Sequence, residues 1–150
     1  MDLKKLMVDT KAVWVDFPGL TGFSVEVANL SRKELNSLRK RCTGQKFDRK
    51  TRAVTETLDE DKFVTEFTLS TVKNWKGLTL ENLSSLLLID VEGKDITKEL
   101  EYNVDNAETL VSSSTEFDTW LNEVVFDLDN FRAGPKEPSP KPPRKDVQES

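Results

Sequence analysis

Acidic side chains are the residues of this sequence best suited to chemistry, because histidine is absent and cysteine occurs once. The absence of histidine removes the commonest general base and the usual zinc ligand. Cys42 alone can form neither an intramolecular disulfide nor a cysteine cage for a metal. The run Asp59, Glu60 and Asp61 supplies neighbouring carboxylates, but acids at a helix start more simply complement the helix dipole. With no glycine-rich phosphate loop and no HExxH pattern, we expect a protein that is not an enzyme and has no catalytic, cofactor or metal site.

Residues 32–52, the basic segment, carry nine Lys or Arg against the two acids Glu34 and Asp48, although the whole chain has a net charge of −5. Such a segment serves as a solvated surface, as a site for an acidic protein partner, or as a site for nucleic acid. Nucleic acid is disfavoured, because Phe47 is the one aromatic residue nearby and the rest of the chain is acidic enough to repel phosphates. A small nucleic-acid-binding regulator that uses this segment stays as the alternative function.

The unequal distribution of charge also predicts self-association. A monomer with a basic end and an acidic remainder can bind a second copy head to tail, and such a contact produces a filament when it does not close into a ring. We expect the basic side of this contact to be formed by four arginines: Arg39, Arg41, Arg49 and Arg52.

The elements that must position these residues are mostly helical. The strongest pattern lies in residues 115–131, where large apolar residues recur at steps of three and four along one stripe of a helix. We expect this stripe to lie in the core. Its members are Phe117, Trp120, Leu121, Val124, Leu128 and Phe131. Val125 and Phe126 lie off the stripe, and we predict that they contact a protein partner; Trp75 and Tyr102 are assigned to the core.

The N-terminal part predicts a β-hairpin. Residues 13–17 and 23–28 are rich in β-branched and aromatic side chains, and turn-forming residues 18–22 separate them. Phe23, Val25 and Val27 fall on one face. Because two strands alone are marginally stable, the hairpin must lie on a helix or recruit another strand.

Two helices are predicted after the hairpin. A capping box from Ser31 to Glu34 starts the first, and Gly44 ends it. A linker of uncertain structure covers residues 45–57. The second helix starts at Asp59 or Glu60 and runs to about Trp75, where Gly77 stops it. Further on, residues 86–89 are too apolar to be exposed, and Asp105 and Thr115 are expected to cap two later helices.

These patterns place the chain in the α+β class, as a mostly helical single domain with an N-terminal β-hairpin and a disordered proline-rich C-terminal tail. We expect a loosely ordered leader in residues 1–10, the domain in residues 11–131 and the tail in residues 132–150, where five of the six prolines lie. No apolar run approaches the ~20 residues of a transmembrane helix. The first residues lack the pattern of a signal peptide, so we expect a location in a reducing cytoplasm without membrane contact.

Three short motifs occur in a fixed order along the second half of the chain. They are Trp75-Lys76-Gly77-Leu78, Tyr102-Asn103-Val104-Asp105-Asn106-Ala107 and Asp127-Leu128-Asp129-Asn130-Phe131. With the capped helix, the basic segment and the acid-started helix that precede them, they resemble the tail assembly chaperones of long-tailed, siphovirus-type bacteriophages. The resemblance covers about residues 12–131.

This resemblance implies a late protein of the infected host cell that binds the tape measure protein, keeps it soluble and helps tail tube subunits polymerise around it. Members of the family act in the host cytoplasm and are absent from the mature virion. They are also known for a programmed frameshift that produces a longer product. A structural tail or connector protein, which would stay in the virion, is a further alternative.

Overall fold

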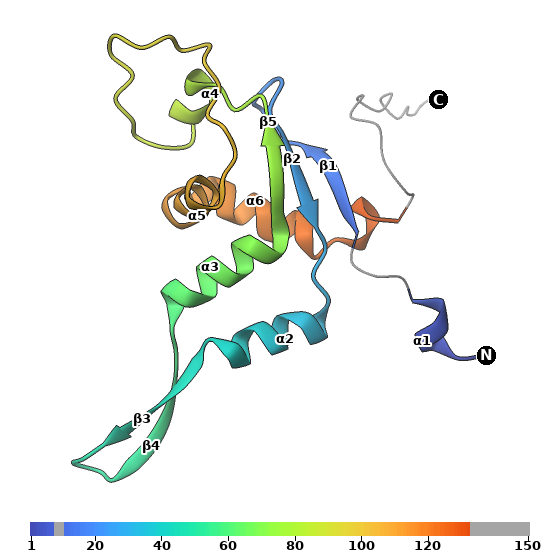
Figure 1. Cartoon of the computed structure of the whole chain (residues 1–150), viewed down its shortest axis with the longest axis vertical. Helices are drawn as coiled ribbons and strands as arrows, with labels where there is room; N and C mark the ends of the chain where they lie inside the picture. Colours follow the sequence, from blue (N-terminus) through green and yellow to red (C-terminus); the bar gives the residue numbers. More distant parts are fainter. Residues whose placement is uncertain (8–10, 133–150) are drawn as a thin grey trace, which may run out of the picture.

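Strand β2 (Ser24–Ala28) is the centre of the fold and lies between two antiparallel neighbours in the order β1–β2–β5. The computed structural model describes residues 1–7 and 11–132, so the expected tail falls almost wholly outside the described residues. β1 (Ala12–Asp16) and β2 form the predicted N-terminal hairpin, in which Val15 pairs with Val25. The hairpin recruits β5 (Val72–Lys76) as its third strand (Figure 1). The α+β class is thereby confirmed.

Four helices of two turns or more accompany the sheet: α2 (Arg32–Arg41), α3 (Glu60–Thr71), α5 (Val104–Ser113) and α6 (Thr115–Val125). Both α3 and α6 contact β2, α5 packs against both of them, and α2 lies along α3. The predicted capping box is confirmed, since Ser31 accepts from the Glu34 N–H and Glu34 accepts from the Ser31 N–H. Asn103 and Ser114, each one or two residues before the expected caps, cap α5 and α6 instead.

An aromatic cluster joins α6 to the hairpin. The ring of Phe17 lies 4.9 Å from that of Trp120 and 5.5 Å from that of Phe23, and the rings of Phe117 and Trp120 are 5.6 Å apart. All four side chains are buried. The expectation that the stripe of α6 lies in the core is therefore correct for its first part.

For the later residues of the stripe, that expectation is wrong for Leu128 but correct for Phe131. α6 ends at Val125, so Leu128 no longer follows the helical period and is 56% exposed, whereas Phe131 returns to the core after the short 3-10 helix η1 (Leu128–Asn130). Val125, predicted to contact a partner, is 1% exposed. The buried face of α6 is wider than one stripe because the helix packs against both α5 and the sheet. Phe126 is exposed, as expected.

The helix predicted to run to Trp75 ends at Thr71, and the chain continues as β5. A returning segment secures the outer edge of β5. Trp75 Nε1 donates to the Leu100 carbonyl at 2.9 Å, and the Tyr102 hydroxyl donates to the Val72 carbonyl at 2.7 Å. Trp75 is buried in the core as expected, and Tyr102 is half-buried.

The connection between β5 and α5 begins at Gly77, which has a φ of +76° and lies against the backbone of Gly22. It therefore follows a strand and does not end a helix. The short helix α4 (Leu80–Ser84) comes next. The expectation that residues 86–89 are buried is wrong for Leu88, which is fully exposed, whereas its apolar neighbours are half-buried.

Residues 45–57, predicted as a linker, lie within a second β-hairpin. β3 (Thr43–Asp48) pairs with β4 (Ala53–Leu58) in a two-stranded sheet that extends away from the fold (Figure 1). Gly44 lies within β3 and does not end α2. At the other end of the chain, the leader contains one short, fully exposed helix, α1 (Leu3–Leu6).

Candidate interaction surfaces

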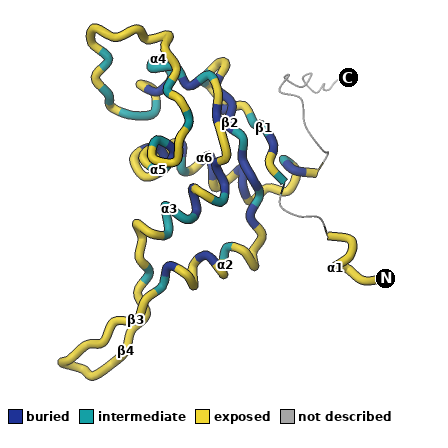
Figure 2. The backbone as a smooth tube through the Cα atoms, viewed as in Figure 1, coloured by how far each residue is buried: buried dark blue, intermediate teal, exposed yellow. Residues whose placement is uncertain are grey.

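The hairpin of β3 and β4, which we call the arm, is exposed along almost its whole length (Figure 2). Residues 44–57 are all exposed, and only Thr43 and Leu58 at its base are half-buried. Phe47 and Val54 are cross-strand partners and lie on the same face, with exposed fractions of 57% and 59%. Since a lone two-stranded hairpin is marginally stable in water, this apolar pair gives the arm a face that a partner can cover.

The turn of the arm is held by its own hydrogen bonds. Asp48 accepts from the Arg52 N–H at its carbonyl (2.6 Å) and from the Lys50 N–H at Oδ1 (2.9 Å). Arg52 has a φ of +59°, which a non-glycine residue adopts rarely and which closes this turn without a glycine. Arg49 and Lys50 at the turn are exposed, so the tip is basic.

The four arginines predicted to mediate self-association do not form one surface. Arg39 lies over the ring of Phe63 at 5.7 Å, and Arg41 makes an ion pair with Glu66 at 3.0 Å. Both are therefore engaged with α3 of their own chain, on different sides of α2. Arg49 and Arg52 lie together at the tip of the arm. The basic segment thus separates into a helical part that packs on α3 and a projecting part.

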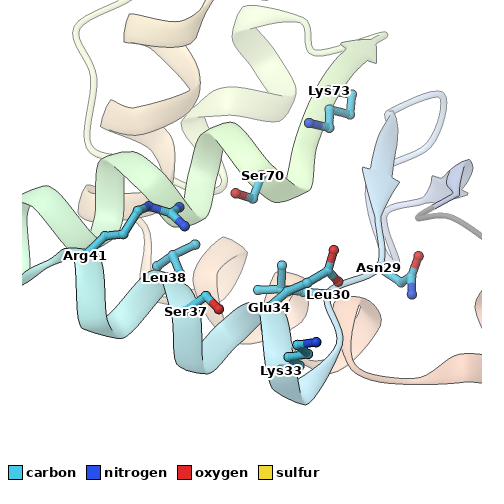
Figure 3. A pocket seen from close by; sticks show the side chains of 9 residues that line it. All are labelled: Asn29, Leu30, Lys33, Glu34, Ser37, Leu38, Arg41, Ser70 and Lys73. Carbon is cyan, nitrogen blue, oxygen red and sulfur yellow. The ribbon is translucent and has the colours of Figure 1, made fainter.

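A groove of about 410 Å³ runs between α2 and the end of α3 (Figure 3). Lys33 and Arg41 from α2 face Lys73 at the start of β5, and Leu30 and Leu38 form part of the lining. The Lys73 ammonium donates to the Leu69 carbonyl at 2.9 Å. Arg41 is paired to Glu66, but this pair is partly exposed, so it offsets the positive charge of the groove only weakly.

Phe126 ends a row of aromatic side chains that begins on α3. The ring of Phe67 lies 5.9 Å from that of Phe63 and 6.4 Å from that of Phe126. Phe67 is buried, Phe63 is half-buried and Phe126 is 42% exposed, so the row leads from the core to the surface. Phe126 is therefore both anchored to the core and available to a partner.

The surface around Phe126 is acidic. From residue 99 to residue 131 the sequence contains nine Asp or Glu and no Lys or Arg. We call five exposed residues the α6 end: Glu123, Phe126, Asp127, Leu128 and Asp129. Asp129 makes an ion pair with Arg132 at 2.7 Å, but both side chains are about two-thirds exposed or more, and such pairs hold charge weakly.

In the part of the chain that the structure describes, three titratable groups have a pKa shifted from its ordinary value. Burial raises the pKa of Asp118, although a hydrogen bond from Asn122 opposes the shift, and burial raises the pKa of Tyr102. Hydrogen bonds from Thr97 lower the pKa of Asp95 in an exposed loop. Among the described residues, no three His, Cys, Asp or Glu lie close enough to hold a metal ion.

Within residues 1–7 and 11–132, no helix is both long and apolar enough to cross a membrane. In comparisons with known proteins, no family model, no curated protein and no solved structure matches this chain.

Sequence reasoning found the basic character of the arm and the exposure of Phe126, but it missed the arm itself. The available signal was Phe47 between the polar residues Lys46 and Asp48, and Val54 followed by threonines at positions 55 and 57. It was obscured because the turn between the strands contains neither glycine nor proline.

Proposed function

We propose that this chain is a tail assembly chaperone of a long-tailed phage. In this role it binds the tape measure protein, keeps that elongated partner soluble and helps tail tube subunits polymerise around it. The proposal requires no catalytic residue, cofactor or metal. It requires surface that contacts another protein and affinity low enough for the chaperone to be displaced when the tube closes around the tape measure protein.

The observation that carries the proposal is a pair of aromatic side chains that this fold leaves in solvent, each near an exposed aliphatic one. Phe47 and Val54 project on the arm, and Phe126 and Leu128 lie at the α6 end, each more than two-fifths exposed. The core of the domain does not need them, because it is closed by other residues such as Phe117 and Trp120. Exposed apolar groups with polar neighbours are typical of surfaces that bind proteins.

The motifs that resemble those of the chaperone family have structural roles in this fold. Trp75 and Tyr102 contact each other edge-on at 5.1 Å and hold the segment that returns along β5. Asn103 caps α5, and Asn130 donates from its side chain to the Val124 carbonyl at 3.1 Å, closing the end of α6. The family motifs therefore coincide with residues that build this fold, which explains why a resemblance would reside in them.

Co-expression with the tape measure protein tests the function. The probe is the long, helical product of the neighbouring gene, and the measurement is its soluble fraction after centrifugation. We expect the wild-type chain to keep it soluble and the variant with Phe47→Ser and Phe126→Ser to fail. Leu88→Ser is the control, because Leu88 is an apolar residue that is even more exposed and lies in a different loop. A partner that stays insoluble with the wild-type chain would contradict the proposal.

Two further measurements separate the proposal from its alternatives. Mass spectrometry of purified virions should not detect the chain, since a structural tail or connector protein would remain there. Retention on DNA should be weak, because the chain has a net charge of −5 and its acidic part repels phosphates. Strong retention with a steep salt dependence would instead favour a nucleic-acid-binding regulator. A longer frameshifted product, if made, would appear as a second band with an antibody against residues 11–131.

A further inference from the structure

The arm and the α6 end carry matching chemistry on separate parts of the molecule. The arm presents one aromatic and one β-branched side chain, Phe47 and Val54, beside a basic tip. The α6 end presents one aromatic and one aliphatic side chain, Phe126 and Leu128, beside three carboxylates. Figure 1 shows the arm directed away from the fold, whereas α6 lies against the sheet, so a chain does not bring its own two surfaces together.

We propose that the arm of one copy docks on the α6 end of a second copy. In this contact Phe47 and Val54 cover Phe126 and Leu128, while the tip residues Arg49 and Lys50 face the carboxylates of the neighbour. The occupant is a second copy because this chain itself supplies the complementary charge: the α6 end carries the exposed carboxylates of Glu123, Asp127 and Asp129. The contact deepens the proposed function, on which it rests, by naming the surfaces through which copies line up along an elongated partner.

The geometry of the contact determines what it builds. The two surfaces differ, so the contact is heterologous, and a pair of copies keeps one free arm and one free α6 end. Copies therefore line up head to tail in one orientation, and they form an open row unless the rotation between neighbours closes a ring. An open row is the arrangement that matches a long partner, because its length is not fixed by the symmetry of the contact.

The strength of the contact follows from its exposure. The charges on both surfaces are solvated, and the Arg132 side chain and Asp48 each neutralise part of them. Exposed ion pairs contribute little each, and salt screens them. The contact is therefore weak, depends on concentration and loosens as the ionic strength rises, which suits a protein that must leave its partner.

Two charge-reversal variants of the full chain test the contact by sedimentation velocity at low ionic strength. The arm variant carries Arg49→Glu and Lys50→Glu, and the α6-end variant carries Glu123→Lys and Asp129→Lys. All four positions are exposed, so we expect unchanged circular dichroism and thermal unfolding. Each variant alone should self-associate at least about tenfold more weakly than the wild-type chain, which itself forms concentration-dependent rows that shorten between about 50 mM and about 500 mM salt.

An equimolar mixture of the two variants is the decisive sample. In the mixture, the acidic arm of the arm variant meets the basic α6 end of the α6-end variant. The unaltered arm of the α6-end variant meets the unaltered α6 end of the arm variant. Association should therefore return to the wild-type level. The control carries Lys94→Glu and Lys98→Glu, the same change in net charge as in the arm variant, on an exposed loop at the opposite end from the arm (Figure 1). It should associate like the wild-type chain.

A wild-type chain that remains monomeric at ~1 mM would overturn the proposed contact, as would a mixture in which association does not return. Association lost equally in the Lys94 and Lys98 control would attribute the effect to net charge and would overturn it too. These outcomes are distinguishable from a failure of the proposed function, because the co-expression assay measures the solubility of a different protein and does not depend on the mass of the free chaperone.

Discussion

Gly77 is the position where a single added methyl group should test the fold most directly. Its φ of +76° is disfavoured for any residue with a Cβ, and a Cβ built there would lie 1.8 Å from the carbonyl oxygen of Gly22. Hydrogen bonds hold the residue in place: its N–H donates to Glu99 and its carbonyl accepts from the Asn82 side chain. The added atom therefore forces a backbone shift of more than about 1 Å, given that real Cβ contacts are essentially never below 3.0 Å.

The magnitude can be worked out by comparison with Gly93, which has nearly the same φ of +74° but nothing within 4 Å of an added Cβ. Gly93→Ala should cost about 1 kcal/mol, because the strain of the left-handed conformation of about 1–2 kcal/mol is partly offset by the lower entropy of the unfolded chain. Gly77→Ala carries the same strain plus about 1–3 kcal/mol for forcing an atom into occupied space. We expect a total of about 2–4 kcal/mol.

Urea unfolding followed by tryptophan fluorescence measures both variants, and the slope of the free energy against urea must be the same for the comparison to hold. The quantity to compare is the difference in the free energy of unfolding between Gly77→Ala and Gly93→Ala, because the strain of the left-handed conformation is the same in both and cancels. A difference below about 0.5 kcal/mol would mean that the turn around Gly22 yields freely, and the close approach of the two backbones would then have no energetic role.

Three further predictions use the same assay. Trp120→Ala should lower the free energy of unfolding by about 3–5 kcal/mol, because it empties part of the aromatic cluster. Phe126→Ala should lower it by less than about 1.5 kcal/mol, because Phe126 is exposed. Similar losses in the two variants would place Phe126 in the core. Thr68→Val should raise the free energy of unfolding by about 1 kcal/mol, because the buried Thr68 hydroxyl lacks a hydrogen-bond partner among the described residues, and a loss would reveal a partner. Burial raises the pKa of Asp118 above 3.8, so the wild-type chain should gain stability relative to Asp118→Asn as the pH falls through that raised pKa. A difference in the free energy of unfolding between the two chains that does not change between pH 3 and 7 would contradict the shift.

Local pattern was sufficient for the parts of the fold whose structure is decided by neighbours in the sequence. The β1–β2 hairpin follows from alternation and turn residues, and the start of α2 follows from the capping box of Ser31 and Glu34. β5 was missed because Trp75 continues the helical spacing of Phe63 and Phe67. Its strand conformation is set by pairing with β2, which lies far away in the sequence.

The interaction surfaces were only partly predictable for the same reason. Whether Val125 is buried depends on how many other elements pack against α6, and this cannot be read from the sequence of α6 alone. Phe126 could be placed outside the core because it falls off the stripe. Arg39 and Arg41 could be recognised as basic but not as engaged, since Phe63 and Glu66, which they contact, belong to the next helix.

The base of the arm has a consequence for how this protein can change over evolution. The Asp59 N–H donates to the Cys42 carbonyl at 2.8 Å, and Thr43 pairs with Leu58, so the chain leaves and re-enters the domain at almost the same point. Residues 43–58 can therefore be lengthened, shortened or exchanged with little strain on α2 and α3, because the entropy of closing a loop grows slowly with its length. Mutations in the arm can thus change its contacts without affecting the core, so the protein can gain a new binding partner while its fold stays the same.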